Sequence, residues 1–347
     1  MEKLRKNSGY AWLIVAVTYF ASFMAPMNQF KIPPVADAVI PAFGMDPVTF
    51  GWLMSSISII GVLLAFPTVF IVRKIGLKGT TLLAVACLCI GSLLGALFDS
   101  LAVLFVGRFI EGFGIGLLGV SAPAAITVWF DADKRGLPLG VWATWFPVGT
   151  VIMFNIGPAI GAALGWKSLW WLCAICCAIA FILFLLIYRL PSANAEEEVT
   201  ITASPLECLK VLKNRNIWLL GVSFGCWNLI ILGCINSFYN QYLGEAWGMD
   251  PQMASTVTSI LTAIALVLMP ILGFVTDRVK RRKPFVVFSF FCILAGSFFA
   301  FIGAGNMVIL VAFIAISGLG MALAGAASRP IAPEIMPATA LGATMGM

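Results

Sequence analysis

Residues 284–328 read PFVVFSFFCILAGSFFAFIGAGNMVILVAFIAISGLGMALAGAAS and contain no charged residue. A helix that crosses the hydrocarbon core of a bilayer needs about 20 apolar residues. The run is therefore long enough for two membrane-spanning helices, and Gly303-Ala304-Gly305-Asn306 supplies a turn between them. Its length and its lack of apolar–polar alternation argue against membrane strands.

Similar runs recur along the whole chain. Span-length stretches without Asp, Glu, Lys or Arg are 7–30, 47–72, 79–98, 136–166, 168–188, 216–244 and 251–276. Residues 100–130 are equally apolar except for Arg108 and Glu111. Together with the two helices of 284–328 these runs predict ten spans, and the uncharged tail 335–347 is the expected start of an eleventh.

The composition excludes most other classes of protein. Of the 347 residues 61% are hydrophobic and 10% are charged, whereas a soluble domain carries about 25% charged residues. So few charges argue against a soluble protein, a disordered chain and a nucleic-acid binder. The chain has no His, and Cys173, Cys176 and Cys177 lie in an apolar run without acidic neighbours. We therefore expect no metal, no cofactor and no enzymatic activity.

The distribution of basic residues predicts the orientation in the membrane. With the N-terminus in the cytoplasm, 17 of the 21 Lys and Arg residues fall in cytoplasmic segments, and Lys31 and Lys167 fall outside. Cytoplasmic loops of membrane proteins carry such an excess of basic residues. Because little of the chain extends beyond the spans, we expect a bacterial inner-membrane protein with a cytoplasmic N-terminus.

A repeat divides the spans into two groups. Five glycines have a glycine counterpart 206 positions later, namely Gly112, Gly114, Gly119, Gly136 and Gly140. A constant offset through a loop predicts a six-helix unit used twice in parallel, as in transporters whose halves are related by an axis along the membrane normal.

The repeat also predicts the domain boundaries. We expect an N-terminal six-helix bundle at 1–189, a cytoplasmic linker at 190–215, and a C-terminal bundle at 216–347 that holds four helices and the start of a fifth. The second unit would extend past Met347, so the sequence is expected to be an incomplete chain.

Three motifs carry a resemblance to a known family. The loop 273–282, GFVTDRVKRR, resembles G-x-L-A-D-R-x-G-R-K, and the loop after the second span keeps Gly76 and Lys78 of that motif. Residues 108–114, RFIEGFG, are similar to R-x-x-Q-G-x-G, and 157–161, GPAIG, resembles the G-P-x-x-G antiporter motif. In their order and spacing these motifs resemble the major facilitator superfamily over essentially the whole chain.

The resemblance implies a fold and a mechanism. It implies an all-α membrane protein with two pseudo-symmetric helix bundles, here with ten complete transmembrane helices and a stub of an eleventh, that exposes a central site alternately to each side. Residues 28–34, NQFKIPP, and 134–136, KRG, are similar to the cyanate and nitrate/nitrite branch. The nitrate porters of that branch carry an Arg in spans two and eight, and this sequence does not.

The predicted function is secondary active transport of a small solute. Residues Arg108, Arg329 and Lys31 against Glu111 give an excess of positive charge within the spans, which favours a small organic or inorganic anion. Coupling to H⁺ or to a counter-substrate would supply the energy. The expected partners are this solute and the lipid bilayer, with no nucleic acid and a monomeric chain. The alternatives are a proton-coupled multidrug efflux transporter and a membrane protein or inactive fragment without transport activity.

The charges inside the spans are the first candidate site. Glu111 follows Arg108 by three residues and so lies on the same face of the fourth span. Arg108 would bind or sense an anionic group, with Glu111 adjusting its charge or carrying a proton. The alternatives are a structural Arg–Glu pair and an Arg bonded to carbonyls of a neighbouring helix. Asn28, Gln29 and Lys31 would attract an anion to an outward-facing cavity, or Lys31 would extend to the headgroups.

Further candidates are uncharged. Asn155, Asn228 and Asn236 would line the substrate path or join helices, and Trp145 would form a cavity wall or an interfacial anchor.

A last group is expected to control the conformational change. Gly149, Gly157 and Gly161, with Pro158, form a smooth helix face that we expect at the interface between the bundles, with a packing groove as the alternative. Asp277 would contact the N-terminus of the fifth span. The remaining members of this group are Gly76, Lys78, Gly273, Arg278, Arg329 and Glu334.

Overall fold

The computed structural model describes residues 9–65, 67–131, 134–191, 215–279, 283–302 and 305–328. Its regular structure in these ranges is helical, as the uncharged runs predict. The first group of elements is α1 (Gly9–Gln29), η1 (Pro33–Val35), α2 (Ala36–Ala42), α3 (Pro47–Ala65), α4 (Pro67–Leu97), α5 (Leu101–Thr127), α6 (Gly136–Ala143), α7 (Trp145–Leu164) and α8 (Lys167–Ile187). The second group is α11 (Arg215–Asn228), the π-helix η3 (Leu229–Ile235), α12 (Asn236–Trp247), α13 (Pro251–Val279), α14 (Lys283–Phe301) and α15 (Met307–Ser328).

Eight helical stretches in the described residues are long and apolar enough to cross a bilayer. They correspond to predicted spans one, three to eight and ten. Within α3 and α14 the apolar helices Pro47–Gly61 and Lys283–Phe299 are shorter. An all-helical membrane fold is therefore confirmed, whereas ten complete spans are not, and the expected start of an eleventh lies outside the described residues.

The loop after the second predicted span coincides with an interruption of α4. Gly76 has φ 73° and ψ 172°, and helical backbone continues on both sides of it. This positive φ favours glycine, because a Cβ would strain the backbone there. The interruption falls between the second predicted span, 47–72, and the third, 79–98.

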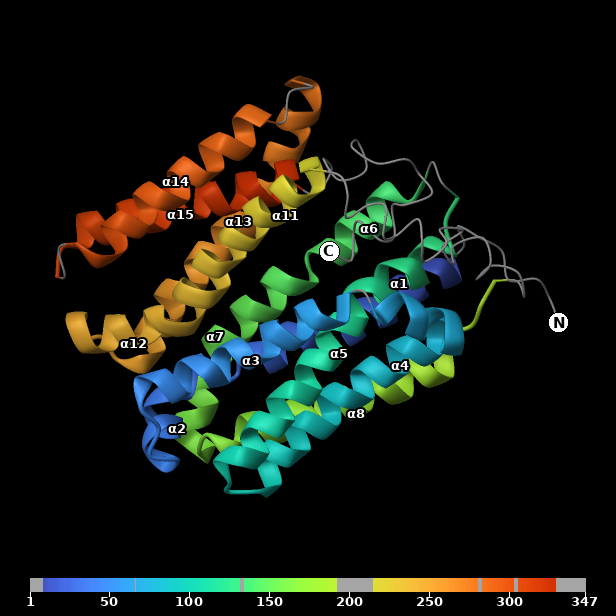
Figure 1. The fold of residues 1–347 in the computed structure, drawn as a ribbon, viewed down its shortest axis with the longest axis horizontal. Coiled ribbons are helices and arrows are strands. Elements are labelled where there is room, and N and C mark those ends of the chain that lie inside the picture. The colour runs from blue at the N-terminus through green and yellow to red at the C-terminus, as the bar shows by residue number, and fades with distance from the viewer. Residues whose placement is uncertain are drawn as a thin grey trace.

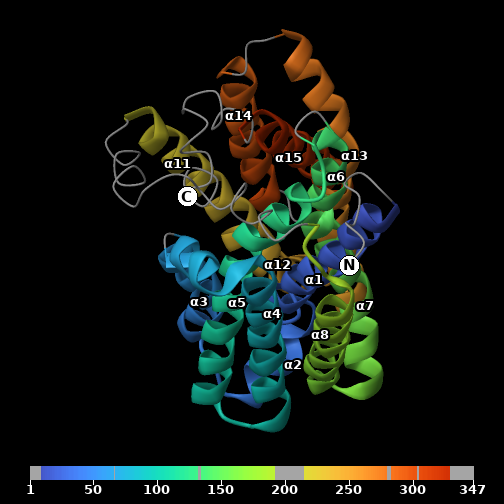
Figure 2. The same cartoon turned by 90° about the vertical axis from the view of Figure 1, so that its right-hand side faces the viewer.

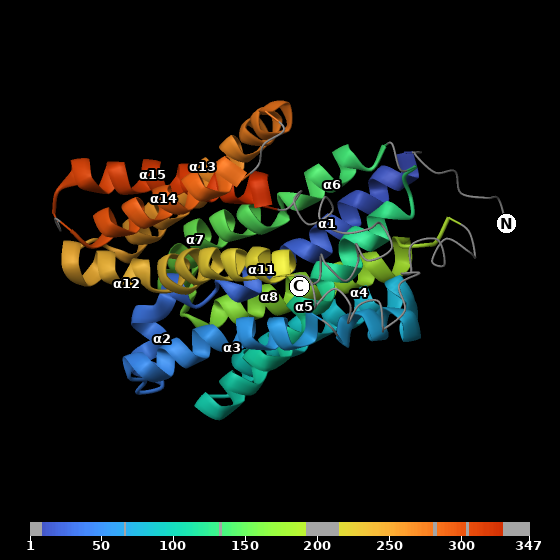
Figure 3. The same ribbon diagram turned by 45° about the horizontal axis from the view of Figure 1, so that its top comes forward.

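The two groups lie side by side and meet along α7 and α13 (Figure 1). In the first group α4 lies between α5 and α8 (Figure 2). In the second group α15 packs against both α13 and α14 (Figure 3). The buried hydrophobic residues form separate clusters, two drawn from residues 11–188 and one from residues 227–324.

Glycine packing repeats between the groups. A Cβ on Gly114 of α5 would meet Ala84 and Cys87 of α4, and a Cβ on Gly320 of α15 would meet Ser289 and Cys292 of α14. Gly112 likewise faces Ile57 of α3, as Gly318 faces Ile264 of α13. The arrangement α3–α5–α4 thus recurs as α13–α15–α14, in agreement with the predicted duplication. The boundaries 1–189, 190–215 and 216–347 stay predictions, since most of the linker lies outside the described residues.

Candidate functional site

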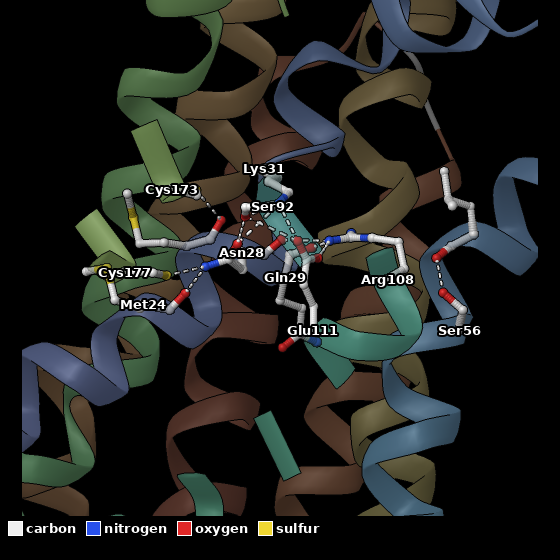
Figure 4. Close-up of polar contacts among 12 residues, drawn as sticks. Met24, Asn28, Gln29, Lys31, Ser56, Ser92, Arg108, Glu111, Cys173 and Cys177 are labelled. Atoms are coloured by element: carbon white, nitrogen blue, oxygen red, sulfur yellow. Dashed lines mark hydrogen bonds and ion pairs between the residues drawn. The ribbon is translucent and has the colours of Figure 1, made fainter. Parts of the chain in front are cut away.

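Three charged side chains meet inside the first group of helices (Figure 4). One oxygen of the Glu111 carboxylate, Oε1, lies 2.5 Å from Lys31 Nζ, and Oε2 lies 2.9 Å from Arg108 Nη1. The exposed fractions of the three residues are 0% for Lys31 and Glu111 and 1% for Arg108. Two cations and one carboxylate are thus enclosed together, and the cluster has a net charge of +1.

Arg108 joins α5 to the end of α1. Its Nη1 and Nη2 donate to the carbonyls of Asn28 and Gln29 at 2.7 and 2.9 Å. These are the last two residues of α1, whose carbonyls have no partner within the helix. A cation at this end also opposes the negative end of the helix dipole. The structure therefore matches the alternative of an Arg bonded to a neighbouring helix and paired with Glu111.

Neutral groups complete the cluster. Lys31 Nζ donates to Ser92 Oγ of α4 at 2.7 Å and to Asn28 Oδ1 at 3.1 Å. The Ser92 hydroxyl donates to Asn28 Oδ1, and Asn28 Nδ2 donates to the Met24 carbonyl at 2.8 Å. The Lys31 ammonium also lies 5.1 Å from the centre of the Trp170 ring of α8. Four helices, α1, α4, α5 and α8, hold these groups.

Two glycines let the helices approach closely enough for this contact. A Cβ on Gly91 would lie 2.5 Å from Glu111 Cγ and 2.5 Å from the Gly107 carbonyl oxygen. A Cβ on Gly95 would lie 2.2 Å from the indole nitrogen of Trp170. Gly91, Gly95 and Ser92 were not among the candidates chosen from the sequence. The spacing of Gly91 and Gly95 by four, with Ser92 between them, is the signal that marks one face of the third span.

The placement of Lys31 corrects both sequence-based interpretations of this residue. Lys31 neither faces an outward cavity nor extends to the headgroups, because it is fully buried and paired with Glu111. The segment after α1 stays packed against the helices: η1 lies against α7, and Pro33, Pro34 and Val35 are themselves buried. Gln29 is also buried, and it contributes its backbone carbonyl to the cluster.

Asn155 lies where the two helix groups meet. Its Nδ2 donates to Ser259 Oγ at 2.9 Å, and its carbonyl accepts from Gln252 Nε2 at 2.9 Å. Thr256 Oγ1 donates to Asn155 Oδ1 at 3.3 Å. The three partners on α13 were not selected from the sequence, although Gln252, Thr256 and Ser259 lie at helical spacing on one face. We call these four residues the polar clasp.

The other uncharged candidates lie apart from the charged cluster. Asn236 is buried at the start of α12, and its amide nitrogen has no hydrogen-bond partner within the described ranges. Asn228 is half-buried at the end of α11, directly before the π-helix η3. Trp145 begins α7 and packs edge-on against Phe146.

The glycine face of α7 contacts α1 and η1. A Cβ on Gly149 would meet Pro26 at 2.5 Å, one on Gly157 would meet Pro34 at 3.0 Å, and one on Gly161 would meet Val35 at 2.4 Å. The expectation that this face lies between the two helix groups is therefore wrong, and the packing groove is what the structure shows. Pro158 lies inside α7 next to this face and is buried.

The loop motif is described only in part. Lys78 Nζ donates to the Leu185 carbonyl at 2.7 Å and so joins α4 to α8. Gly273 has open space at its Cβ position, and Arg278 is exposed in the last turn of α13. The contact of Asp277 with the fifth span stays a prediction, and Arg329 and Glu334 lie outside the described residues. No group of three His, Cys, Asp or Glu side chains in the described ranges could hold a metal ion.

Comparison with known proteins identifies relatives. A model of the Major Facilitator Superfamily matches residues 18–347. The chain is 27% identical to Azole resistance protein 1 of Saccharomyces cerevisiae over 215 residues, which cover 61% of this chain and 34% of that protein. It is 23% identical to the nitrite extrusion protein of Bacillus subtilis over 228 residues, or 65% of this chain and 55% of that protein. The chain thus spans about a third to a half of the length of these relatives.

The fold also resembles a solved structure. A crystal structure of a D-xylose–proton symporter superposes with a TM-score of 0.76 at 16% sequence identity. The superposition covers 97% of this chain and 86% of the symporter. At this level of identity the likeness concerns the fold, and it agrees with the helix arrangement described above.

Proposed function

Because the chain belongs to the Major Facilitator Superfamily, we propose that it is a secondary transporter that moves a small anion across the membrane by alternating access. It would sit in a bacterial inner membrane as a monomer with its N-terminus in the cytoplasm, as the distribution of basic residues favours. The transported solute would be coupled to H⁺ or to a counter-substrate.

The charged cluster carries this proposal. Ionisable side chains inside membrane-spanning helices are costly and mark ion or substrate pathways and proton relays. Buried ion pairs can often be replaced by apolar residues without loss of stability, so their cost argues for a role beyond packing. The pair of Lys31 and Arg108 on a single Glu111 leaves one positive charge uncompensated, which favours an anion as the solute.

The polar clasp supports alternating access. It joins α7 to α13 through hydrogen bonds between hydroxyl, amide and carbonyl groups, and in the described ranges each cluster of buried hydrophobic residues stays within one helix group. Hydrogen bonds of this kind contribute about 0.6 kcal/mol each on average between membrane helices. Such contacts are weak enough to break and re-form as one group rocks against the other.

The class of solute rests on charge and on one relative. The name of the nitrite extrusion protein associates a small inorganic anion with a protein similar to this one. The name of Azole resistance protein 1 associates a drug-like compound with another. The net positive charge of the cluster supports the anion, because an uncompensated cation disfavours the cationic amphiphiles that efflux transporters often move.

Transport by the purified protein in liposomes tests the proposal. Uptake of nitrite, nitrate, cyanate and formate would be compared with uptake of a lipophilic cationic dye, each with and without a pH gradient. We expect uptake of at least one of the anions and its loss in Arg108→Gln. Uptake of the dye alone would support multidrug efflux, and no uptake of any compound would support a non-transporting protein.

A further inference from the structure

The charged cluster contains one proton more than it needs to be neutral. We propose that Lys31, rather than Glu111, carries the coupling proton, and that a proton and a monovalent anion are therefore transported together. This inference rests on the proposed transport function and assigns its coupling ion. It follows from the hydrogen bonds of each charged group and from the charge that remains when one proton leaves.

Each of the two carboxylate oxygens of Glu111 pairs with a cation. Its Oε1 faces the Lys31 ammonium at 2.5 Å and its Oε2 faces the Arg108 guanidinium at 2.9 Å. A proton added to this carboxyl group would leave two buried cations without a counter-charge and would displace one of them from an oxygen. Each oxygen of the carboxylate thus has a cation as its partner, which leaves no free acceptor for a further proton.

Arg108 cannot carry the proton either. An arginine side chain keeps its charge in proteins. Its guanidinium is held by the Asn28 and Gln29 carbonyls as well as by Glu111. Arg108 and Glu111 thus form a neutral pair that is complete without Lys31.

Lys31 has partners that suit both of its protonation states. Apart from Glu111, its Nζ contacts the neutral groups Ser92 Oγ at 2.7 Å and Asn28 Oδ1 at 3.1 Å. A neutral amine still donates to the Asn28 oxygen and to Glu111, and it accepts a hydrogen bond from the Ser92 hydroxyl, which rotates to donate. Loss of the proton leaves none of these buried groups without a partner.

The other titratable groups around Lys31 are thiols. Three helices pack against Lys31. Helix α5 contributes Arg108 and Glu111, and α8 contributes Trp170 and the thiols of Cys173 and Cys177. Helix α4 contributes Ser92 and carries the Cys89 thiol, which lies against α8. Cys173 donates to the Met27 carbonyl and Cys89 donates to the Ala174 carbonyl. Asn28 donates to Cys177. These contacts leave Lys31 as the group that changes charge.

Deprotonation of Lys31 removes the excess charge of the cluster. The Nζ–H bond of Lys31 breaks, the electron pair remains on nitrogen, and the proton passes to water on the side to which the path is open. The charge of the cluster falls from +1 to zero, so an anion in the path loses its attraction. Lys31 is the second residue after the end of α1, in the non-helical joint before η1, where movement of the joint would expose it.

Coupling between the binding of the proton and the binding of the anion is reciprocal. If the charged form of Lys31 favours the anion, then the bound anion must favour the charged form of Lys31 by the same factor. Proton and anion are therefore taken up and released together, and transport of a monovalent anion is electroneutral.

Infrared difference spectroscopy tests, without any substrate, whether Lys31 carries the proton. Spectra of the purified protein in lipid are recorded as the pH is raised, for the wild type with ¹⁵N-labelled lysine and for Lys31→Arg. We expect loss of a ¹⁵N-sensitive ammonium band in the wild type that is missing in Lys31→Arg, with a shift of the Glu111 carboxylate stretch. A protonated-carboxyl band in the wild type that disappears in Glu111→Gln would overturn the proposal. So would identical lysine spectra in the two proteins.

Transport of nitrite tests the coupling. With an inward proton gradient we expect the wild type to accumulate nitrite, and Lys31→Met to lose this gradient dependence, with uptake lower by about fivefold or more. Lys31→Arg should still exchange nitrite for nitrite, since exchange needs no proton release, but should not accumulate it. The control Lys167→Met, which removes a surface lysine paired with Asp99, should behave as the wild type.

The infrared and transport experiments distinguish the role of Lys31 as proton carrier from the proposed anion transport. If the wild type moves none of the anions while the infrared result stands, the proposed function fails and Lys31 remains the protonation site. If the wild type accumulates nitrite and Lys31→Arg accumulates it equally, the coupling role of Lys31 is refuted while anion transport stands.

Discussion

The side-chain amide of Asn155 in α7 donates a hydrogen bond of 2.9 Å to the hydroxyl of Ser259 in α13, and this bond crosses between the two helix groups. The same asparagine also bonds to Gln252 and Thr256 of α13. One residue of α7 therefore contacts three residues of the second group. The contact is local, so it can be removed without disturbing the core of either group.

We expect Asn155→Ala to loosen the contact between the helix groups. The substitution removes the two side-chain hydrogen bonds that cross to α13, each of which contributes about 0.6 kcal/mol between membrane helices, and leaves the backbone bond to Gln252. The amide hydrogens of α7 and α13 near the clasp should exchange with solvent about tenfold faster. Hydrogen exchange followed by mass spectrometry on the protein in lipid measures this.

Asn240→Ala is the matched control. Asn240 is a buried asparagine that bonds to Ser255 and Thr258 of α13, but it does so from α12 within the second group. Its loss should reduce stability and leave exchange in α7 unchanged. Equal exchange in α7 for the two variants would mean that the clasp does not hold the groups together.

Gly91→Ala should destabilise the first helix group. The new Cβ would lie 2.5 Å from both Glu111 Cγ and the Gly107 carbonyl oxygen, and a backbone atom cannot rotate away. Overpacking of this kind costs about 1–3 kcal/mol. The midpoint of thermal unfolding in detergent should fall accordingly.

Gly119→Ala provides the comparison at an exposed position of α5. Gly119 lies inside α5 and has no atom within 4 Å of its Cβ position. Alanine is favoured over glycine within a helix by about 0.5–1 kcal/mol, so this variant should be as stable as the wild type or more stable. A lower midpoint for Gly119→Ala than for Gly91→Ala would contradict the packing argument.

Charge counting predicts the order of stability at the cluster. The wild type encloses a net charge of +1, Glu111→Gln would enclose +2, and Lys31→Met would enclose none. Removing the shared partner of two buried cations costs about 3–5 kcal/mol, so Glu111→Gln should be the least stable variant. Lys31→Met should cost less, because it leaves the Arg108–Glu111 pair intact.

The double variant Lys31→Met/Glu111→Gln separates charge from packing. Since it restores a net charge of +1, it should be more stable than Glu111→Gln alone, and the two effects should not add. Thermal unfolding of the three variants, measured under the same conditions, gives the coupling free energy between the two substitutions. Additive losses would mean that repulsion between Lys31 and Arg108 does not determine the cost.

The spans and the repeat could be predicted because both depend on local properties of the chain. An uncharged run must be buried in lipid or protein, and Gly112, Gly114, Gly318 and Gly320 mark close helix contacts in each half. The pairing of Arg108 with Glu111 likewise follows from their spacing by three on one helix.

The position of Lys31 could not be predicted because it depends on which helices pack around the end of α1. A count of basic residues treats every lysine between spans as exposed, whereas this one is buried against groups of α4, α5 and α8. The role of Gly149, Gly157 and Gly161 was missed for a similar reason. Their spacing identifies a smooth face of α7, but only the tertiary structure shows that Pro26, Pro34 and Val35 occupy it.

Arg108→Lys should fail to replace the arginine although it keeps the charge. The guanidinium reaches the Asn28 carbonyl, the Gln29 carbonyl and Glu111 at once, and an ammonium group is too compact to bond to all three. At least one buried acceptor would lose its donor, at a cost of about 1–3 kcal/mol. Thermal unfolding measures this cost, and hydrogen exchange should locate it at the end of α1.

Arg135→Lys is the control for this substitution. The bond from Arg135 Nε to the Phe130 carbonyl is one that lysine can supply, so the midpoint of thermal unfolding of this variant should change little. If Arg108→Lys matched that control, charge alone would hold α1 against α5, and the geometry of the guanidinium would be unimportant.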